Sequence, residues 1–239
     1  MIDLISDFIT LTLKCNLIQW GQSFSFQEKI IAMLEIRGLK FGYEETLVSN
    51  LSFTVKPGEM VLIHGPSGCG KSTLLSLISG THSSDVNWTG KIMLFGEDIS
   101  HRPPHYRSIG LMYQDPLLFP HLTVEENLAF GLAPSFKGRQ RKNMITEALV
   151  ASGLSGFEKR DPYSLSGGQS SRVALMRSLL AAPKALLLDE AFSGLDTALR
   201  GQFGQFVALQ LQEKNIPAVL VSHNESDSEF TSGEILHLG

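Results

Sequence analysis

The chain has 239 residues, of which 43% are hydrophobic and 18% are charged, and its formal net charge is −4. This composition is ordinary for a globular protein of one large or two small domains. The slightly acidic balance argues against sequence-independent binding of nucleic acid, which depends on many Lys and Arg side chains that neutralise phosphates. We therefore expect no nucleic-acid partner.

The amino-terminal stretch has the features of neither a membrane span nor a secretory signal. A span needs roughly 18 consecutive apolar residues, and the best candidate, residues 2–20, is broken by Asp3, Asp7 and Lys14. A signal peptide opens with basic residues, whereas the first charges here are acidic. The chain has only two cysteines, too few for a disulfide framework, which indicates a reducing compartment. We expect a cytoplasmic protein.

Regular hydrophobic periodicity begins at Met33. Residues 33–41 alternate like a strand, and a second strand pattern over residues 51–59 contains the turn Lys56-Pro57-Gly58. We therefore interpret residues 1–32 as an N-terminal extension, either disordered or the product of a start codon assigned too far upstream. The alternative is an amphipathic segment that contacts a membrane or a partner.

Four short apolar runs follow, at residues 60–65, 108–114, 185–190 and 218–223. Such runs are typical of strands in a parallel sheet that is buried on both faces. Helical patterns separate them, and residues 123–182 have no strong strand signal. This segment predicts a helical insertion whose last helix is ended by Pro183, because the residue before a proline avoids the α region.

Two clusters receive structural interpretations. The first consists of Lys137, Arg139, Arg141 and Lys142. We interpret it as a solvated helix start, with contact to an acidic loop of a partner or to lipid headgroups as the alternative. The second is the pair His101 and His105, which has the spacing of helical metal ligands. Pro103-Pro104 between them excludes that helix, so no metal is assigned to the pair.

The segment GPSGCGKST, residues 65–73, lies between an apolar strand and a helical pattern and matches the phosphate-loop pattern G-x-x-x-x-G-K-[ST]. In such a loop, backbone N–H groups from Ser67 to Lys71 hold phosphates, Lys71 reaches the β- and γ-oxygens, and Ser72 ligates Mg²⁺. Cys69 is interpreted as a small tolerated residue. The predicted nucleotide-binding residues are Gly65, Pro66, Ser67, Gly68, Cys69, Gly70, Lys71, Ser72 and Thr73.

Asp189 and Glu190 end the third apolar run, at the strand end where ligand sites of open α/β sheets lie. Asp189 fits a magnesium ligand, bound directly or in the second sphere, and Glu190 fits a general base that polarises the attacking water. An acidic pair at a strand end is usually just solvated. The phosphate loop upstream favours the functional interpretation, because such a loop needs a Walker-B-type aspartate.

Three further side chains follow predicted strands. His223 would emerge at the same sheet edge as Asp189, where it can donate a hydrogen bond to the γ-phosphate or to the attacking water. Gln114 ends another apolar run and is placed to contact Mg²⁺ or water. Tyr43 can lay its ring on adenine, although a tyrosine after a strand is more often a packing residue.

A second anion site is indicated in the stretch YSLSGGQSSR, residues 163–172. Gly167 and Gly168 follow Ser166 at the start of an apolar helical run. Glycine lets backbone N–H groups approach a ligand, and a helix N-terminus carries partial positive charge. The local pattern leaves open which phosphate this site serves.

Together these motifs resemble the ATP-binding subunit of ABC transporters over essentially all of residues 33–239. LSGGQ, residues 165–169, is similar to the signature motif of that family. The other matches are Tyr43 as the adenine-stacking aromatic, residues 65–73 as the Walker A loop, Gln114 as the Q-loop, Ser193–Asp196 as the D-loop and His223 as the switch histidine. The resemblance implies an α/β fold: a P-loop ATPase core with a mostly parallel sheet, a small antiparallel β-subdomain and the helical insertion.

The resemblance also implies a shared site and several partners. In that family two ATP-binding domains pair head to tail, so Ser166, Gly167, Gly168 and Gln169 would contact ATP held by a second copy, and isolated chains would be poor enzymes. ATP hydrolysis, with Mg²⁺ held by Ser72, Gln114 and Asp189, would drive a transmembrane permease. Residues 117–132 resemble importer subunits for small solutes or ions, which work at the cytoplasmic face of the inner membrane with a permease and a solute-binding protein.

The sequence departs from the family pattern at three places. Ser170-Ser171 replace basic or amide side chains, Ala191 replaces a proline, and the chain stops soon after His223, so no appended regulatory domain is expected. A soluble ABC ATPase of DNA repair or translation is the alternative function. Those proteins carry long coiled-coil inserts or tandem cassettes, and neither pattern is present. A P-loop kinase or GTPase has no role for LSGGQ.

Overall fold

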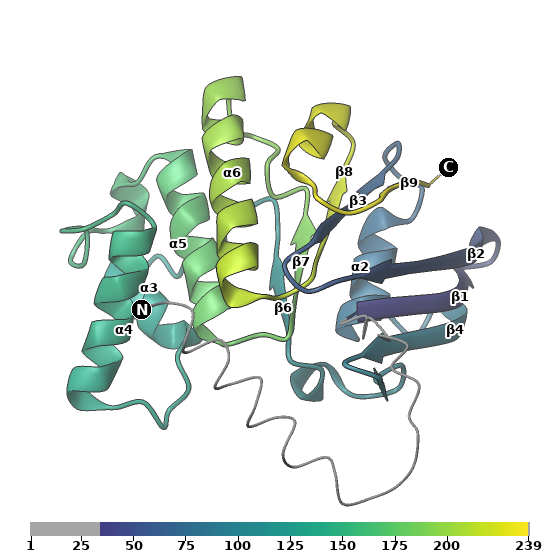
Figure 1. Cartoon of the computed structure of the whole chain (residues 1–239), viewed down its shortest axis with the longest axis horizontal. Helices are drawn as coiled ribbons and strands as arrows, with labels where there is room; N and C mark the ends of the chain where they lie inside the picture. Colours follow the sequence, from purple (N-terminus) through teal and green to yellow (C-terminus); the bar gives the residue numbers. More distant parts are fainter. Residues whose placement is uncertain (1–33, 239) are drawn as a thin grey trace, which may run out of the picture. The chain divides into compact units, whose positions relative to one another are not determined.

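Two β-sheets form the framework of residues 34–238, the part of the chain that the computed structural model describes (Figure 1). The predicted extension, residues 1–32, lies outside this range. A five-stranded parallel sheet has the strand order β6-β7-β8-β3-β9, and a four-stranded antiparallel sheet has the order β2-β1-β4-β5. The predicted α/β fold with a small antiparallel subdomain is confirmed.

The parallel sheet consists of β3 (Met60–His64), β6 (Ile109–Met112), β7 (Ala185–Asp189), β8 (Ala218–Ser222) and β9 (Ile235–His237). The four apolar runs are therefore confirmed as strands. Strand β9 was not predicted. Its three residues are exposed or half-buried at the sheet edge, so they show no apolar run.

The antiparallel sheet consists of β1 (Leu34–Gly42), β2 (Thr46–Val55), β4 (Asn87–Leu94) and β5 (Glu97–Asp98). Strand β1 follows the predicted pattern over residues 33–41, whereas β2 starts five residues before the predicted run of residues 51–59 and ends at Val55. Strand β4 has no clear alternation because Gly90 interrupts it with a φ of +118°, next to a register shift in its pairing with β1. A glycine inside a strand commonly marks such an irregularity, where another backbone approaches closely.

Alternate residues of the parallel strands face two different cores. In β3, Met60 and Leu62 belong to one core and Val61 and Ile63 to the other. The first core is completed by α3 (Val124–Gly131), α4 (Gly138–Ala151), α5 (Gly167–Leu180) and α6 (Thr197–Lys214). The second is completed by α2 (Lys71–Ser79) and the antiparallel sheet (Figure 1). Because both faces are covered, functional side chains are left to the strand ends.

The segment between β6 and β7 is helical: α3, α4 and α5 occupy it together with the 3₁₀ helix η2 (Pro162–Ser164). Before it, η1 (Pro104–Tyr106) follows Pro103, so His101 and His105 share no α-helix. No helix within residues 34–238 is both long enough and apolar enough to cross a membrane.

The basic cluster does mark a helix start, with Lys137 as the N-cap of α4. Its interpretation as wholly solvated is wrong for Arg141. This side chain is half-buried and donates hydrogen bonds to the carbonyl oxygens of Ala129, Ala133 and Phe136. It therefore ties α4 to the end of α3.

Candidate functional site

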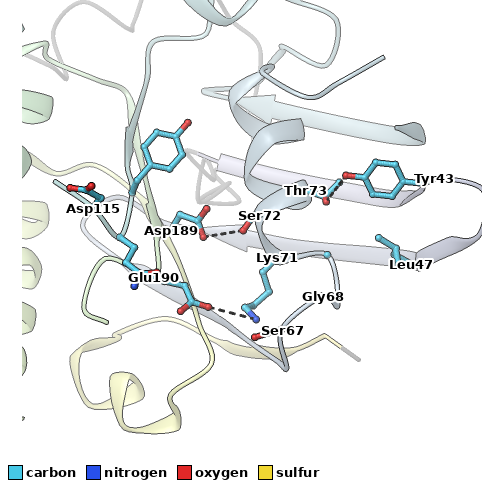
Figure 2. Close-up of a pocket in the computed structure, with 13 residues that line it drawn as sticks. Tyr43, Leu47, Ser67, Gly68, Lys71, Ser72, Thr73, Asp115, Asp189 and Glu190 are labelled. Atoms are coloured by element: carbon cyan, nitrogen blue, oxygen red, sulfur yellow. Dashed lines mark hydrogen bonds and ion pairs between the residues drawn. The ribbon is translucent and has the colours of Figure 1, made fainter. Parts of the chain in front are cut away.

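A pocket of about 640 Å³ opens at the carboxyl ends of β3, β6 and β7 (Figure 2). This volume is in the range of sites for small molecules. The lining combines the phosphate loop with side chains from strand ends and from the antiparallel sheet. It consists of Tyr43, Leu47, Ser67, Gly68, Gly70, Lys71, Ser72, Thr73, Tyr113, Gln114, Asp115, Asp189 and Glu190.

The phosphate loop connects β3 to α2 by a turn that depends on two glycines. Gly68 and Gly70 have φ values of +85° and +102°, a region that residues with side chains rarely adopt. Gly70 is the N-cap of α2 and supplies no side-chain hydrogen bond. The N–H groups in the first turn of α2 are therefore available to an anion.

Lys71 folds back over this loop. Its Nζ donates to the carbonyl oxygens of Gly65 at 2.7 Å and Pro66 at 2.8 Å, and it lies 4.0 Å from Glu190 Oε1. The side chain is only 6% exposed. A buried ammonium group needs such partners, and an anion bound in the loop would supply stronger ones.

Two loop residues lie behind the pocket rather than on its lining. A Cβ at Gly65 would collide with the Leu238 carbonyl, just beyond β9. The Cys69 side chain packs against the second core, and its N–H points to the Pro66 carbonyl at 3.5 Å. Gly65 and Cys69 therefore shape the loop, whereas Ser67, Gly68 and Gly70 line the pocket.

Ser72 and Asp189, two of the predicted magnesium ligands, lie side by side. Ser72 Oγ donates to Asp189 Oδ1 at 3.2 Å. Burial raises the pKa of the Asp189 carboxyl, against the opposing effects of the Ser72 hydrogen bond and the Lys71 charge. Hydroxyl and carboxylate oxygens suit Mg²⁺, and a cation here would offset the burial of the carboxylate. These two residues fit a magnesium ion, and Gln114 lines the same pocket.

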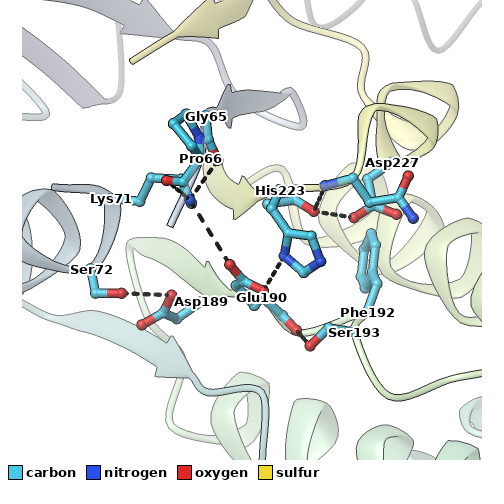
Figure 3. A network of polar contacts seen from close by, with 12 residues as sticks. Gly65, Pro66, Lys71, Ser72, Asp189, Glu190, Phe192, Ser193, His223 and Asp227 are labelled. Carbon is cyan, nitrogen blue, oxygen red and sulfur yellow. Dashed lines mark hydrogen bonds and ion pairs between the residues drawn. The ribbon is translucent and has the colours of Figure 1, made fainter. Parts of the chain in front are cut away.

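Glu190 lies between Lys71 and His223 (Figure 3). Its Oε2 is 2.6 Å from His223 Nδ1, and its Oε1 faces the Lys71 ammonium. The backbone of Glu190 has a φ of +48°, which is uncommon for a residue with a side chain and typical of strained functional positions. A hydrogen bond of 3.0 Å from its N–H to the Val221 carbonyl holds this conformation.

Tyr43 lies at the opposite side of the pocket from the acidic residues (Figure 2). Its hydroxyl is 3.4 Å from Thr73 Oγ1, and its side chain is 48% exposed. Asn87 holds its backbone by donating to the Tyr43 carbonyl at 2.9 Å. Tyr43 is therefore not packed in a core, and its ring forms an aromatic surface at one end of the pocket.

The signature residues do not line this pocket. Ser166 is the N-cap of α5, and its hydroxyl accepts from the N–H of Gln169 while the Gln169 side chain accepts from the N–H of Ser166. Gly167 is exposed, whereas Gly168 is buried near Leu199. The described residues therefore contain two glycine-rich helix N-termini that serve separate surfaces.

Two departures from the family pattern have structural consequences that are small. Ser171 is buried, and its hydroxyl donates to the Gly167 carbonyl at 3.0 Å. Ala191 lies in the first core. Neither residue lines the phosphate-loop pocket.

Several residues in and near the pocket were not predicted from the sequence. Tyr113 and Asp115 flank Gln114, so their position in the chain was a usable signal. Leu47 had none, because only the pairing of β2 with β1 brings it to the pocket. Arg200 and Asp227 form an ion pair near the loops that carry Glu190 and His223. They were also not predicted, because Arg200 lies on α6 and Asp227 follows β8, far apart in the sequence.

Comparisons with known proteins agree with this geometry. Residues 48–193 match the family described as ABC transporter. The chain is 47% identical over 184 residues to an uncharacterized ABC transporter ATP-binding protein of Escherichia coli strain K12, YnjD, and the match covers 77% of this chain and 85% of that protein.

Two longer relatives carry the names of transport proteins. One is the putrescine transport ATP-binding protein PotG of Escherichia coli strain K12, with 39% identity over 211 residues, 87% of this chain and 55% of the relative. The other is the Fe(3+) ions import ATP-binding protein FbpC of Brucella abortus strain 2308, with 39% identity over 198 residues, 82% of this chain and 55% of the relative. The chain thus spans about half the length of these relatives.

Among solved structures, cbiO1 from Clostridium perfringens, described as part of the ABC transporter complex cbiONQ, superimposes with a TM-score of 0.76. Its sequence is 25% identical, and the match covers 85% of this chain and 84% of that chain. The fold and the motif order therefore point to the same family.

Proposed function

Because the chain belongs to the ABC transporter family and is one of its ATPases, we propose that it hydrolyses MgATP to drive a permease that imports a small solute or ion. Glu190 carries this proposal. Its carboxylate lies 2.6 Å from His223 and 4.0 Å from Lys71, in a pocket that the phosphate loop closes on one side.

In the proposed complex the start of α2 and Lys71 bind the phosphates of ATP. Lys71 exchanges the carbonyl oxygens of Gly65 and Pro66 for phosphate oxygens, and Tyr43 stacks on adenine. Ser72, Asp189 and Gln114 hold Mg²⁺. When bound, this ion neutralises the charge that develops on the phosphate oxygens.

Glu190 acts as the general base for the attacking water, and His223 orients it. An Nδ1–H that is donated to Glu190 Oε2 aims the carboxylate and leaves Nε2 as an acceptor that can face the attacking water. The strained backbone of Glu190 supports the assignment, because strain of this kind is concentrated at functional sites. Such a base contributes about 10²–10⁴-fold in rate.

A second copy of the chain completes the site in this proposal. Ser166, Gly167, Gly168 and Gln169 lie outside the pocket formed by their own phosphate loop. The start of α5 is exposed at Ser166 and Gly167, so it is accessible to ATP that a second chain holds. A head-to-tail homodimer would place it on the γ-phosphate of the partner, so an isolated chain is a poor enzyme.

The permease would dock near the segment that follows Gln114. Gln114 lines both the phosphate-loop pocket and a pocket of about 360 Å³ that Gly167 and Ser193 also line. Arg177 of α5 donates to the carbonyl oxygens of Pro116 and Leu117 at 3.1 Å and 3.0 Å. Movement of this segment is thereby linked to the helix that carries the signature motif.

Two aromatic side chains, Phe119 and Phe130, lie next to each other in and after this segment. Phe130 is 67% exposed, and its ring lies 4.6 Å from that of Phe119.

The names of PotG and FbpC support a small cationic solute or a metal ion as cargo. The chain would then work at the cytoplasmic face of the membrane, bound to a permease and served by a solute-binding protein.

Turnover of the complex with its permease tests this function. Glu190→Gln should bind ATP normally, while kcat falls by about 10²–10⁴-fold because the base is lost. Glu97→Gln, which changes an exposed glutamate on β5, is the matched control and should keep wild-type turnover. Near-normal hydrolysis by Glu190→Gln would contradict the proposal, as would purification without a multi-span membrane protein.

A further inference from the structure

Asp227 forms a buried network beside the site that the proposed mechanism does not use (Figure 3). It lies in the 3₁₀ helix η3 (Glu225–Phe230) and is 1% exposed. Its Oδ2 accepts a hydrogen bond of 2.6 Å from Ser222 Oγ. Its Oδ1 accepts no hydrogen bond from any residue in the range 34–238, and Arg200 Nη1 lies 3.7 Å away.

The contacts of Ser222 anchor the chain on both sides of His223. Ser222 is the last residue of β8, and its hydroxyl accepts from the N–H of Asn224 at 3.0 Å while it donates to Asp227. The residues directly before and after His223 are thus joined through one hydroxyl to one carboxylate. This arrangement limits the positions that the imidazole can reach.

Arg200 connects the same carboxylate to the loop that carries Glu190. Arg200 lies in the first turn of α6, and its Nε donates to the Phe192 carbonyl at 3.2 Å. Ser193, the next residue, donates to the Glu190 carbonyl through both its hydroxyl at 2.8 Å and its N–H at 2.9 Å. A displacement of Arg200 would therefore reach Glu190 through two residues.

We propose that Asp227 is a positioning residue that holds Glu190 and His223 in register, through Arg200 on one side and Ser222 on the other. This inference rests on the proposed function, in which Glu190 is the base. The two loops start from neighbouring strands, β7 and β8, and the carboxylate of Asp227 interacts with both. Without this negative charge, Arg200 would lose the ion pair that it forms among the described residues.

The ionised carboxylate of Asp227 does not stabilise the folded protein. Burial raises the pKa of Asp227, despite the Ser222 hydrogen bond and the nearby charges of Arg200 and His223. A folded-state pKa above the unfolded value means that the ionised form is disfavoured by folding, so ionised Asp227 costs stability at neutral pH. A neutral isostere should fold at least as well, and the value of the charge then lies in the geometry of the site.

Asp227→Asn in the full chain, assembled with its permease, tests the inference. We expect kcat for ATP hydrolysis to fall about 10- to 100-fold, because small displacements of a catalytic group are costly. KM and the number of ATP-binding sites should not change, and the melting temperature at pH 8 should stay the same or rise. Asp98→Asn is the matched control, since Asp98 also accepts a hydrogen bond from a serine, Ser100, at 2.5 Å, but outside the pocket. It should keep wild-type kcat.

Arg200→Met gives a second test that does not depend on the folding of Asp227→Asn. It should show at least the same loss of kcat at unchanged KM, because it removes the ion pair with Asp227 and also the hydrogen bond to the Phe192 carbonyl. The double variant should lose no more than Arg200→Met alone, because the Asp227–Arg200 contact is then already absent. Additive losses would overturn the inference. So would wild-type kcat in Asp227→Asn beside an inactive Glu190→Gln, or a loss of kcat that merely parallels a loss of ATP-binding sites. Equal turnover of wild type and Glu190→Gln would overturn the proposed function itself, and this inference with it.

Discussion

The starts of α2 and α5 are both glycine-rich, but only α5 has a side chain that caps its backbone N–H groups. At α2 the N-cap is Gly70, in a left-handed conformation and without a capping side chain. At α5 the N-cap is Ser166, which forms a complete capping box with Gln169. Neither helix has an acidic side chain in its first turn.

The start of α2 has no capping side chain and gains hydrogen bonds when an anion binds, whereas the start of α5 is already capped without a ligand. At α2 no side chain caps the first-turn N–H groups and Lys71 lies beside them, so a bound anion stabilises this helix end directly. The capping box of α5 already satisfies part of its end, which leaves the backbone of Gly167 and Gly168 in place before any ligand arrives. In the proposed dimer, such a preformed helix end can bind the γ-phosphate of ATP held by the second chain without first changing its own structure.

Removing the ammonium group of the α2 site should have the largest effect. Lys71→Ala should weaken ATP binding about 10- to 100-fold, because a charge-assisted hydrogen bond contributes roughly 1.5–3 kcal/mol, and hydrolysis should be lost. Titration with a fluorescent ATP analogue measures the affinity. Lys91→Ala, at an exposed lysine of β4, is the control. Unchanged affinity in Lys71→Ala would refute the assignment of the phosphate loop.

The same variant tests whether the two sites belong to different chains. Gly168→Asp should inactivate, because it adds a negative charge at the helix start that would approach the partner's phosphate, while a Cβ there makes only ordinary contact with the Leu199 side chain at 3.5 Å. Mixed dimers of Lys71→Ala with Gly168→Asp contain one composite site without lesions, so part of the activity should return. Verified mixed dimers that hydrolyse ATP no faster than either parent would contradict the expectation that one intact composite site is enough for turnover.

Loss of the cap at α5 should have a moderate effect. Ser166→Ala should lower the free energy of unfolding by about 1 kcal/mol, as typical for an N-cap serine, and should also reduce ATPase activity. Thr123→Ala is the matched control, because Thr123 and Glu126 form the same capping box on α3. It should lose similar stability and keep its turnover per folded dimer. Equal activity losses in both variants would mean that Ser166 acts only as a cap.

The smallest effect is expected for the pH dependence of stability at the metal site. Burial raises the pKa of Asp189, so wild-type stability is lost as pH rises from the unfolded pKa through the higher folded pKa. The melting temperature of Asp189→Asn should therefore match wild type in acid and exceed it at pH 8. Asp98 gives the opposite sign, because hydrogen bonds from Ser100 lower its pKa, so Asp98→Asn should lose stability as pH rises. A pH-independent difference for Asp189→Asn would contradict the burial effect.

Local features of this protein could be predicted from its sequence, whereas features that join distant residues could not. The phosphate loop, the acidic end of β7 and the signature motif were all located, because each needs particular residues at adjacent positions. Strand β4 was missed, since Gly90 breaks its alternation. Arg141 was misread because its carbonyl partners lie at the end of α3 and in the loop that follows it.

The sequence by itself determined the family, the parallel strands and the motif residues, since apolar runs and glycine conformations act over a few neighbouring residues. Only the tertiary structure decided which of these residues meet. The 2.6 Å contact of Glu190 with His223 joins residues from β7 and β8, and Asp227 and Arg200 reach it from η3 and α6. Burial of such charges is set by the packing of whole elements, which no local pattern encodes.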